Sequence, residues 1–201
     1  YALTLPEERA GLLGEQGVDV VVTLPFDRAL ASWSAEQFVR RLKERIGLRQ
    51  LWVGYDFALG RGREGDLPAL RHLGEQLDYV LHVISPVQTQ QTTVSSSMIR
   101  ALLRDGKVAE AASLLGRRYG MSGVVVHGDG RGRTIGIPTA NLHAPVELVT
   151  PANGVYATWA FVGGQQFQAV TNIGLRPTFI DQPTLPQIET LLLEVDRDLY
   201  G

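Results

Sequence analysis

The sequence predicts an α/β half followed by an all-β half, and two features of its pattern lead to this prediction. Over about the first 118 residues, strand-like apolar runs alternate with amphipathic helical segments, which is typical of a parallel sheet covered by crossover helices. After residue 119, short strand-like runs follow one another between turns rich in Gly, Pro and Asn, which favours a small antiparallel barrel or sandwich. We therefore expect two domains, residues 1–118 and 119–201, with a boundary near residues 117–122.

The first expected helix begins at a capping-box pattern and is followed by a strand. Thr4 and Glu7 have capping-box spacing, and Pro6 stands in the first turn, where a missing backbone N–H costs nothing. Gly17 then ends the helix. The β-branched run at residues 18–24 predicts a buried strand.

The next expected helix is marked at both ends. Ser34 and Gln37 form a second capping-box pattern, the apolar residues that follow recur at helical spacing, and Gly47 stops the helix. Similar signals predict the other elements of the first half: strands at residues 51–53 and 79–84, a helix from Asp66 to Leu77, and helices at residues 98–104 and 107–115.

Short strands dominate the second half. Gly163 and Gly164 lie between two strand-like runs and predict a hairpin. No long helical pattern occurs from Met121 to Gly201. The expected strands are residues 123–127, 154–162, 166–172 and 188–195.

Composition excludes several classes of protein. Hydrophobic residues make up 44% and charged residues 20% of the 201 residues, as in ordinary globular proteins. The net charge of −2 does not indicate a protein that binds nucleic acid. No apolar run is long enough to cross a membrane. The absence of cysteine excludes disulfides, thiolate catalysis and Cys-based zinc sites, and the four histidines lack metal-ligand spacing.

Small molecules are the expected partners, and neither nucleic acid nor a membrane is. The chain begins at Tyr1 with no leader-like segment, so we expect an internal piece of a longer, cytoplasmic protein. No pattern indicates an oligomeric state. The 22 glycines cluster in a few loops, and we expect the binding sites there.

One glycine-rich loop follows the first strand of the second half. Gly128, Gly130, Gly132 and Gly136 stand there with Arg131, and backbone N–H groups without neighbouring side chains can approach a phosphate. The spacing matches neither the dinucleotide fingerprint nor the Walker A loop. A plain surface turn is an equally good interpretation of this spacing.

Two residues at the end of this loop are candidate metal ligands. Thr139 and Asn141 are two apart, so in an extended segment their side chains face the same side. Hydroxyl and amide oxygens suit Mg²⁺ bound to nucleotide phosphates. Taken alone, the pattern favours a turn in which Thr and Asn bond their own backbone.

One carboxylate, that of Glu189, lies within an apolar strand-like run. The commoner interpretation is a solvent-facing residue of an alternating strand. The alternative is a partly buried base with a raised pKa, which suits the deprotonation of an alcohol.

Ser96, Ser97 and Arg100 stand at the start of an expected helix. Unpaired N–H groups and the helix dipole favour an anion at such a position. Taken alone, an N-cap serine with solvated neighbours is the favoured interpretation.

Gly54, Asp56 and Phe57 follow a strand of the expected parallel sheet. Ligands of such sheets bind at the carboxyl ends of the strands. This position slightly favours a binding role over a plain loop.

Together these motifs resemble those of the bacterial bifunctional FAD synthetases, over essentially the whole chain. The first half is similar to their adenylyltransferase domain at Gly-Val-Asp (17–19), Gly-Tyr-Asp-Phe (54–57), Ser-Ser-Ser-Met-Ile-Arg (95–100) and Leu-Leu-Gly-Arg (114–117). The second half is similar to their riboflavin kinase domain at the glycine loop with Pro-Thr-Ala-Asn (138–141), at Gly-Val-Tyr-Ala (154–157) and at Asn-Ile-Gly-Leu-Arg-Pro-Thr-Phe (172–179).

The resemblance implies a fold and two reactions. The fold would be a partial Rossmann-like nucleotidyltransferase domain followed by a small Greek-key riboflavin kinase barrel. The barrel would phosphorylate riboflavin with ATP to give FMN. The α/β domain would transfer AMP from ATP to FMN, giving FAD and pyrophosphate. Mg²⁺ would accompany ATP.

The resemblance also implies roles for individual residues. Glu189 would be the base on the ribityl hydroxyl, Thr139 and Asn141 would hold Mg²⁺ and phosphate, and the glycine loop at residues 128–136 would cradle ATP. The residues that would bind ATP or flavin in the other domain are Gly54, Asp56, Phe57, Ser96, Ser97 and Arg100.

Departures from the family pattern leave two alternatives open. The chain has no His-x-Gly-His motif, it stops at Gly201 where family members continue, and Leu191 stands where they often carry His. Ser97 also replaces the usual threonine. The alternatives are a kinase-only protein with a degenerate adenylyltransferase scaffold and a non-catalytic flavin- or nucleotide-binding module.

Overall fold

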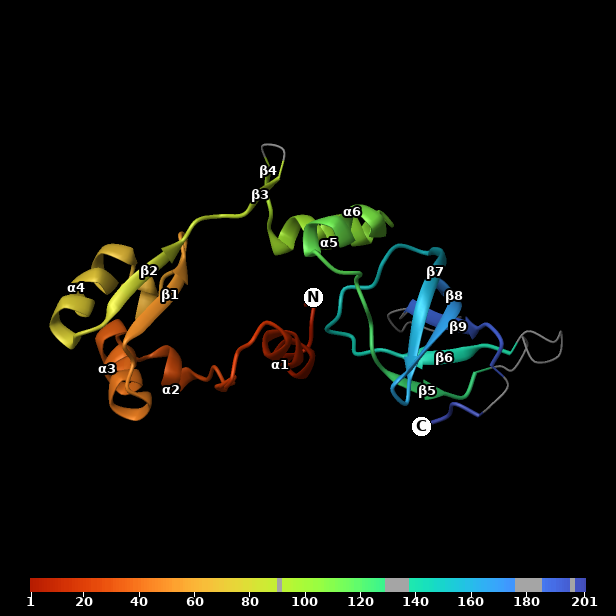
Figure 1. Ribbon diagram of the computed structural model, residues 1–201, viewed down its shortest axis with the longest axis horizontal. Helices are drawn as coiled ribbons and strands as arrows, with labels where there is room; N and C mark the ends of the chain where they lie inside the picture. The colour runs from red at the N-terminus through yellow and green to blue at the C-terminus, as the bar shows by residue number, and fades with distance from the viewer. Residues whose placement is uncertain (90–91, 129–137, 176–185, 196–197) are drawn as a thin grey trace. The chain divides into compact units, whose positions relative to one another are not determined.

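The computed structural model describes residues 1–89, 92–128, 138–175, 186–195 and 198–201 (Figure 1). They form two compact units: residues 20–94 are one, and residues 1–19 with 95–201 are the other. This grouping differs from the expected division of the sequence at residue 118, because segments on either side of residues 20–94 contact the connection between β6 (Ala140–His143) and β7 (Gly154–Val162). The domain boundary near residue 118 stays a prediction.

A parallel pair of strands forms the centre of the unit of residues 20–94. β1 (Gln50–Gly54) pairs with β2 (Val80–Ile84), and the helices α3 (Ala35–Ile46) and α4 (Leu67–Leu77) accompany them. This confirms the strands predicted at residues 51–53 and 79–84 and the two long helices predicted beside them. The helices and strands share a buried cluster of Ala35, Val39, Leu70, Leu73 and Tyr79, against which Leu51 of β1 and Leu81 of β2 pack.

The two longer helices of this unit, α3 and α4, begin at the caps that the sequence predicted. Ser34 and Gln37 form the capping box of α3, and Gly47 ends that helix in the left-handed region. Asp66 caps α4 by accepting a hydrogen bond from Ala69 N at 2.9 Å. Four short elements were not predicted: α2 (Arg28–Ala31), the 3₁₀ helix η1 (Arg61–Arg63), β3 (Gln88–Thr89) and β4 (Thr92–Thr93).

The strand expected at residues 18–24 is absent, so that prediction is wrong. These residues belong to no strand, and Val20 and Val22 are 75% and 65% exposed. A β-branched run is stable as a strand only where neighbouring strands take its backbone hydrogen bonds. Within the described residues, the parallel sheet consists of β1 and β2 alone.

The first helix, α1 (Pro6–Glu15), lacks the expected capping box. Leu5 is its N-cap, and no side chain caps the helix. The hydroxyl of Thr4 instead accepts a hydrogen bond from Arg9 Nε at 3.4 Å. Arginine thus takes the oxygen that the sequence pattern assigned to the backbone N–H of Glu7.

A five-stranded antiparallel sheet dominates the other unit. Its strands are ordered β5-β6-β9-β8-β7, so β9 lies between β6 and β8. The sequence treated β6 as the end of a loop, but it predicted the other four strands with small shifts at their ends. The bounds not yet given are β5 (Val124–Val126), β8 (Gln165–Leu175) and β9 (Pro186–Leu192).

Two predicted helices and a predicted hairpin complete this unit. The helices are α5 (Ser96–Arg104) and α6 (Val108–Leu115). Gly163 and Gly164 form the turn between β7 and β8 with φ values of 56° and 78°, a conformation that favours glycine at both positions. In the described part of the chain, no helix is long and apolar enough to span a membrane.

The antiparallel sheet buries one of its faces. Three threonine hydroxyls form a hydrogen-bonded chain there, since Thr171 Oγ1 lies 2.9 Å from Thr158 Oγ1 and 3.0 Å from Thr190 Oγ1. Because side chains alternate along a strand, the residues between these face the other side. The buried residues of this face are Ala169, Thr171, Ile173, Ile188 and Leu192.

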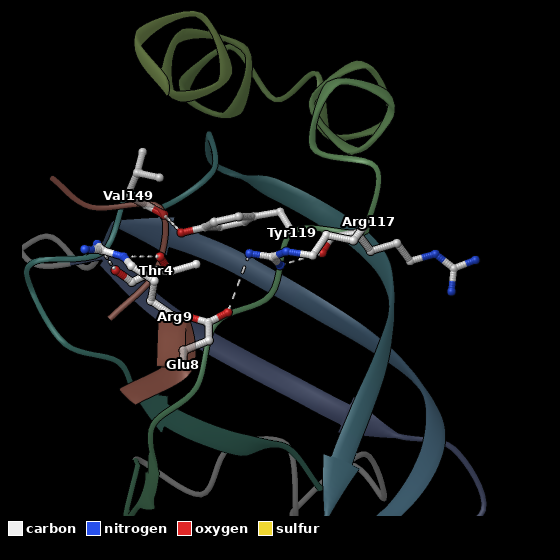
Figure 2. Close-up of polar contacts among 7 residues, drawn as sticks. Thr4, Glu8, Arg9, Arg117, Tyr119 and Val149 are labelled. Atoms are coloured by element: carbon white, nitrogen blue, oxygen red, sulfur yellow. Dashed lines mark hydrogen bonds and ion pairs between the residues drawn. The ribbon is translucent and has the colours of Figure 1, made fainter. Parts of the chain in front are cut away.

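Tyr119 lies between α6 and β5 and is held by polar contacts (Figure 2). Its hydroxyl donates a hydrogen bond to the carbonyl oxygen of Val149 at 2.6 Å. Burial raises the pKa of Tyr119 to about 12, the nearby carboxylate of Glu8 adds to this rise, and the guanidinium of Arg117 opposes it.

We expect Tyr119 to lower the free energy of unfolding in strongly alkaline solution. Its folded pKa of about 12 lies above the value of 10.0 for a free tyrosine. The stabilisation is therefore complete below a pH of about 10 and is lost as the pH rises toward about 12. Urea unfolding across this pH range measures the loss, and Tyr119→Phe should reduce it. An equal loss in both proteins would contradict this role for Tyr119.

Candidate active site

Three polar side chains lie in a row across three strands of the antiparallel sheet. The register pairs Asn141 of β6 with Glu189 of β9, and Glu189 with Asn172 of β8. Directly paired residues of antiparallel strands point to the same face, with Cβ atoms about 5 Å apart. The two amides therefore flank the carboxylate on the face opposite the buried one.

Gln187 connects two members of this row. Its Nε2 donates hydrogen bonds to Glu189 Oε1 at 2.9 Å and to Asn141 Oδ1 at 3.3 Å. All three side chains are partly buried, so these bonds orient the carboxylate and the amide. The sequence analysis missed Gln187, although its place two residues before Glu189 put it on the same strand face. It also missed Asn172, which only the strand register brings to this row.

Asn141 does not adopt the turn that its local pattern favoured. It lies within β6, and its side-chain oxygen accepts from Gln187. Thr139 is partly buried and lies two residues earlier, directly before the strand. Four residues of the predicted ATP loop, Gly130, Arg131, Gly132 and Gly136, lie outside the described residues.

Gly128 follows β5 and lies against the side chain of Asn141. A Cβ atom at position 128 would stand 2.3 Å from Asn141 Nδ2 and 2.7 Å from Asn141 Oδ1, far inside van der Waals contact. The absence of a side chain at Gly128 therefore lets the Asn141 amide occupy its position.

The first turn of α5 carries the predicted anion-binding residues. Ser95 is the N-cap, and its hydroxyl accepts a hydrogen bond from Met98 N at 3.3 Å. Ser97 Oγ accepts a hydrogen bond from Arg100 Nη2 at 3.2 Å, and Ser96 is the first helical residue. The capping role thus falls to Ser95, which leaves Ser96 and Ser97 in the first turn, with Arg100 in the next turn and bonded to Ser97.

The end of β1 carries the other predicted residues, in the unit of residues 20–94. Asp56 Oδ1 lies 3.3 Å from the place that a Cβ atom on Gly54 would take, and Phe57 N donates a hydrogen bond to Gly54 O at 3.2 Å. Arg63 Nη2 donates to Asp56 O at 3.0 Å. These contacts fix a tight loop directly after the strand.

Phe57 also lines an apolar cavity of about 470 Å³ in the same unit. A cavity walled by aromatic rings suits a flat apolar ring system. Phe57 was predicted from the sequence, but the other aromatic and apolar walls were not, and most of them lie between residues 24 and 38. The lining includes Leu24, Phe26, Leu30, Trp33, Phe38 and Phe57.

Comparison with known proteins matches both parts of the chain. The FAD synthetase family model matches residues 1–98, and the riboflavin kinase family model matches residues 115–201. The bifunctional riboflavin kinase/FMN adenylyltransferase of Escherichia coli K12 is 39% identical over 99% of this chain, and that of Bacillus subtilis 168 is 34% identical over 99% of it. Over nearly its whole length, the chain is similar to this bifunctional family.

The chain spans 63% of the length of each of these two family members. A crystal structure from Streptococcus pneumoniae, described as that of a macrolide-efflux protein, is 31% identical to the chain with a TM-score of 0.87. That match covers 99% of this chain and 64% of the other. It agrees with the mixed helix and strand architecture described above.

The amide oxygen of Asn141, which lies beside Gly128, and the carboxylate of its strand neighbour Glu189 would suit a divalent cation. The hydroxyl of Thr139, the amide oxygen of Asn141 and the carboxylate of Glu189 are hard oxygen donors, which Mg²⁺ prefers. Mg²⁺ takes few ligands from a protein and completes its shell with water and phosphate oxygens. Within the described residues, no group of three or more His, Cys, Asp or Glu could hold a metal, so any cation here would depend on phosphate oxygens.

We expect Gly128→Ala to displace the Asn141 amide and to weaken nucleotide binding by about tenfold without unfolding the chain. The added Cβ would collide with the end of a flexible side chain and not with backbone, so the amide rotates away and takes its oxygen with it. Calorimetric titration with Mg-ADP and a thermal melt measure the two quantities. Gly120→Ala is the matched control, because nothing lies within 4 Å of its Cβ position. Unchanged Mg-ADP affinity in Gly128→Ala would contradict the role of this contact.

Proposed function

We propose that this chain carries two steps of FAD synthesis. In the first, ATP phosphorylates riboflavin to FMN, and in the second, ATP adenylylates FMN to FAD with release of pyrophosphate. The row of Asn141, Glu189 and Asn172, oriented by Gln187 next to Gly128, carries the proposal. The curated relatives bear the name of both activities.

For the kinase step, the proposed base is Glu189. It takes the proton from the ribityl hydroxyl, whose oxygen then attacks the γ-phosphorus of ATP, and ADP leaves. Gln187 donates to one carboxylate oxygen and keeps the carboxylate from rotating away from the hydroxyl. Mg²⁺, when bound, neutralises phosphate charge, and Thr139 and Asn141 are the residues that would hold it.

For phosphoryl transfer, the remaining contribution of the chain is positioning. Gly128, Gly130, Gly132 and Gly136 offer backbone N–H groups to the phosphates, and Arg131 adds a positive charge. Kinases of this kind gain most of their rate from such positioning and from charge neutralisation.

For the adenylyl step, a phosphate oxygen of FMN attacks the α-phosphorus of ATP and pyrophosphate leaves. Ser96, Ser97 and Arg100 suit the phosphates, because the start of a helix supplies N–H groups and Arg100 supplies a charge. Gly54, Asp56 and Phe57 are proposed to bind ATP or flavin. The cavity that Phe57 lines supports a flat ring such as the flavin.

We extend the proposal to the finer fold and to the location. The parallel pair of β1 and β2 with its helices supports a Rossmann-like nucleotidyltransferase domain. The strand order β5-β6-β9-β8-β7 supports a Greek-key kinase barrel. A cytoplasmic location is proposed from the absence of cysteine and from the ATP-dependent chemistry.

The test is a product assay on the chain and on any longer protein that contains it. Riboflavin, ATP and Mg²⁺ are supplied, and FMN and FAD are separated by chromatography. We expect both products from the longer protein. FMN without FAD would favour the kinase-only alternative, and riboflavin binding without either product would favour a binding module.

A further inference from the structure

Segments from much earlier in the sequence form backbone hydrogen bonds with the connection between β6 and β7, residues 144–153. Ala2 forms a parallel bridge with Leu148: the N–H of Ala2 donates to Glu147 O at 2.6 Å, and its carbonyl accepts from Val149 N at 2.9 Å. On α5, the carbonyl of Leu103 accepts from Ala152 N at 3.0 Å. The amino-terminal segment and α5 thus both bind the backbone of this connection.

Val149 is the residue on which these contacts converge. Its N–H donates to Ala2, and its carbonyl accepts from the hydroxyl of Tyr119 at 2.6 Å (Figure 2). Val149 is 1% exposed and Leu148 is 2% exposed. Backbone groups so far from water need a partner within the protein, so removing either contact leaves a buried polar group unpaired.

The ion pair beside this residue adds little. Arg117 Nη2 lies 3.8 Å from Glu8 Oε1, and about a third of each side chain is exposed. Ion pairs of this kind are weak. The hydrogen bonds of Val149 and Ala2, together with the guanidinium of Arg104 that lies 5.5 Å from the centroid of the Tyr1 ring, connect residues 1–8 to the rest of the unit.

We propose that residues 144–153 are the docking surface on which the riboflavin kinase part of the chain binds residues 1–8 and α5, so that these segments unfold together with the kinase part. The partner is the chain's own amino-terminal segment, which belongs to the FAD synthetase match. The folding unit would then cross the family boundary, in agreement with the compact unit of residues 1–19 and 95–201.

The exchange of amide protons in helix α1 can be used to measure this docking. It has ten residues, none of which is buried, and an isolated helix of this length is marginal in water. Its amide protons are therefore protected from exchange only while the segment that precedes it is docked. Protection in α1 and at Val149 should rise and fall together.

The experiment compares amide hydrogen exchange, measured by NMR on the whole chain, in the wild type and in two variants. Tyr119→Phe removes the donor to Val149, and Ala2→Pro removes the donor to Glu147. We expect each to accelerate exchange about tenfold both in α1 and at Val149 and Ala152. Unchanged exchange in α1 in both variants would overturn the proposal, even if Val149 itself exchanges faster.

Tyr79→Phe is the matched control. The hydroxyl of Tyr79 also donates to a buried carbonyl, that of Leu70, but in the unit of residues 20–94. Its loss should accelerate exchange in α4 and leave α1, Val149 and Ala152 unchanged. Equal acceleration of α1 by Tyr79→Phe would show a general loss of stability and would overturn the assignment to residues 144–153. None of these measurements depends on catalysis, so a failed activity assay would not affect them.

Discussion

Glu189→Gln should lower the rate of FMN formation by about 10²–10⁴-fold, which is the usual loss when a general base is removed. Glutamine has nearly the same shape and keeps an oxygen that can accept the hydrogen bond from Gln187, now at 2.9 Å. The strand register and riboflavin binding should therefore survive, and only the ability to take a proton is lost. The measurement is the initial rate of FMN formation at saturating ATP, together with riboflavin affinity from the quenching of its fluorescence.

Glu110→Gln is the control for this experiment. Glu110 is an exposed carboxylate in the first turn of α6, in the same compact unit. It should leave the rate of FMN formation unchanged. If the Glu189→Gln variant forms FMN at the rate of the wild type, Glu189 is not the base. The commoner interpretation, a solvent-facing carboxylate on an alternating strand, would then apply.

Asn141→Ala should weaken the binding of Mg-ADP by about 10- to 100-fold, the range found when groups around a metal are removed. Its effect on riboflavin affinity should be smaller. The amide oxygen of Asn141 accepts a hydrogen bond from Gln187 and lies next to Gly128, the first residue of the proposed ATP loop. Calorimetric titrations with Mg-ADP and with riboflavin give the two affinities.

Asn172→Ala is the comparison variant, because Asn172 is the same kind of side chain on the other flank of Glu189. The Mg-ADP affinity should fall less in Asn172→Ala than in Asn141→Ala. A larger loss of riboflavin than of Mg-ADP affinity in Asn141→Ala would refute the metal role. Equal losses of Mg-ADP affinity in the two variants would show that the cation does not distinguish the two flanks.

Local signals predicted most of the elements. A few adjacent residues determine each of these signals, namely the caps of α3 and α4 and the Gly163–Gly164 turn. A single sequence is therefore enough to predict them. Residues 18–24 show the opposite case. Their β-branched side chains favour a strand, but a strand also needs partners, and partners are a property of the whole fold.

The candidate site also has residues that local sequence patterns identify and residues that only the tertiary fold brings together. Glu189 and Asn141 could be selected by residue type and spacing within their own segments. That they are direct neighbours follows from the pairing of β6 with β9, which no local pattern encodes. Asn172 and the aromatic walls around Phe57 were missed for this reason, because they reach their sites through tertiary contacts.

The place of β9 in the sheet has a consequence for the order of folding. β5 and β6 form one antiparallel pair and β7 and β8 another, and each pair joins strands that are neighbours in the sequence. Within the described residues, β9 connects the two pairs by inserting between β6 and β8. Of its two pairings, the one with β6 joins segments that are far apart in the sequence, whereas β8 directly precedes β9. Pairings between distant segments form late because of their loop-closure entropy. During synthesis, strands that are neighbours in the sequence can pair first, and the row of Asn141, Glu189 and Asn172 is completed when β9 pairs with β6.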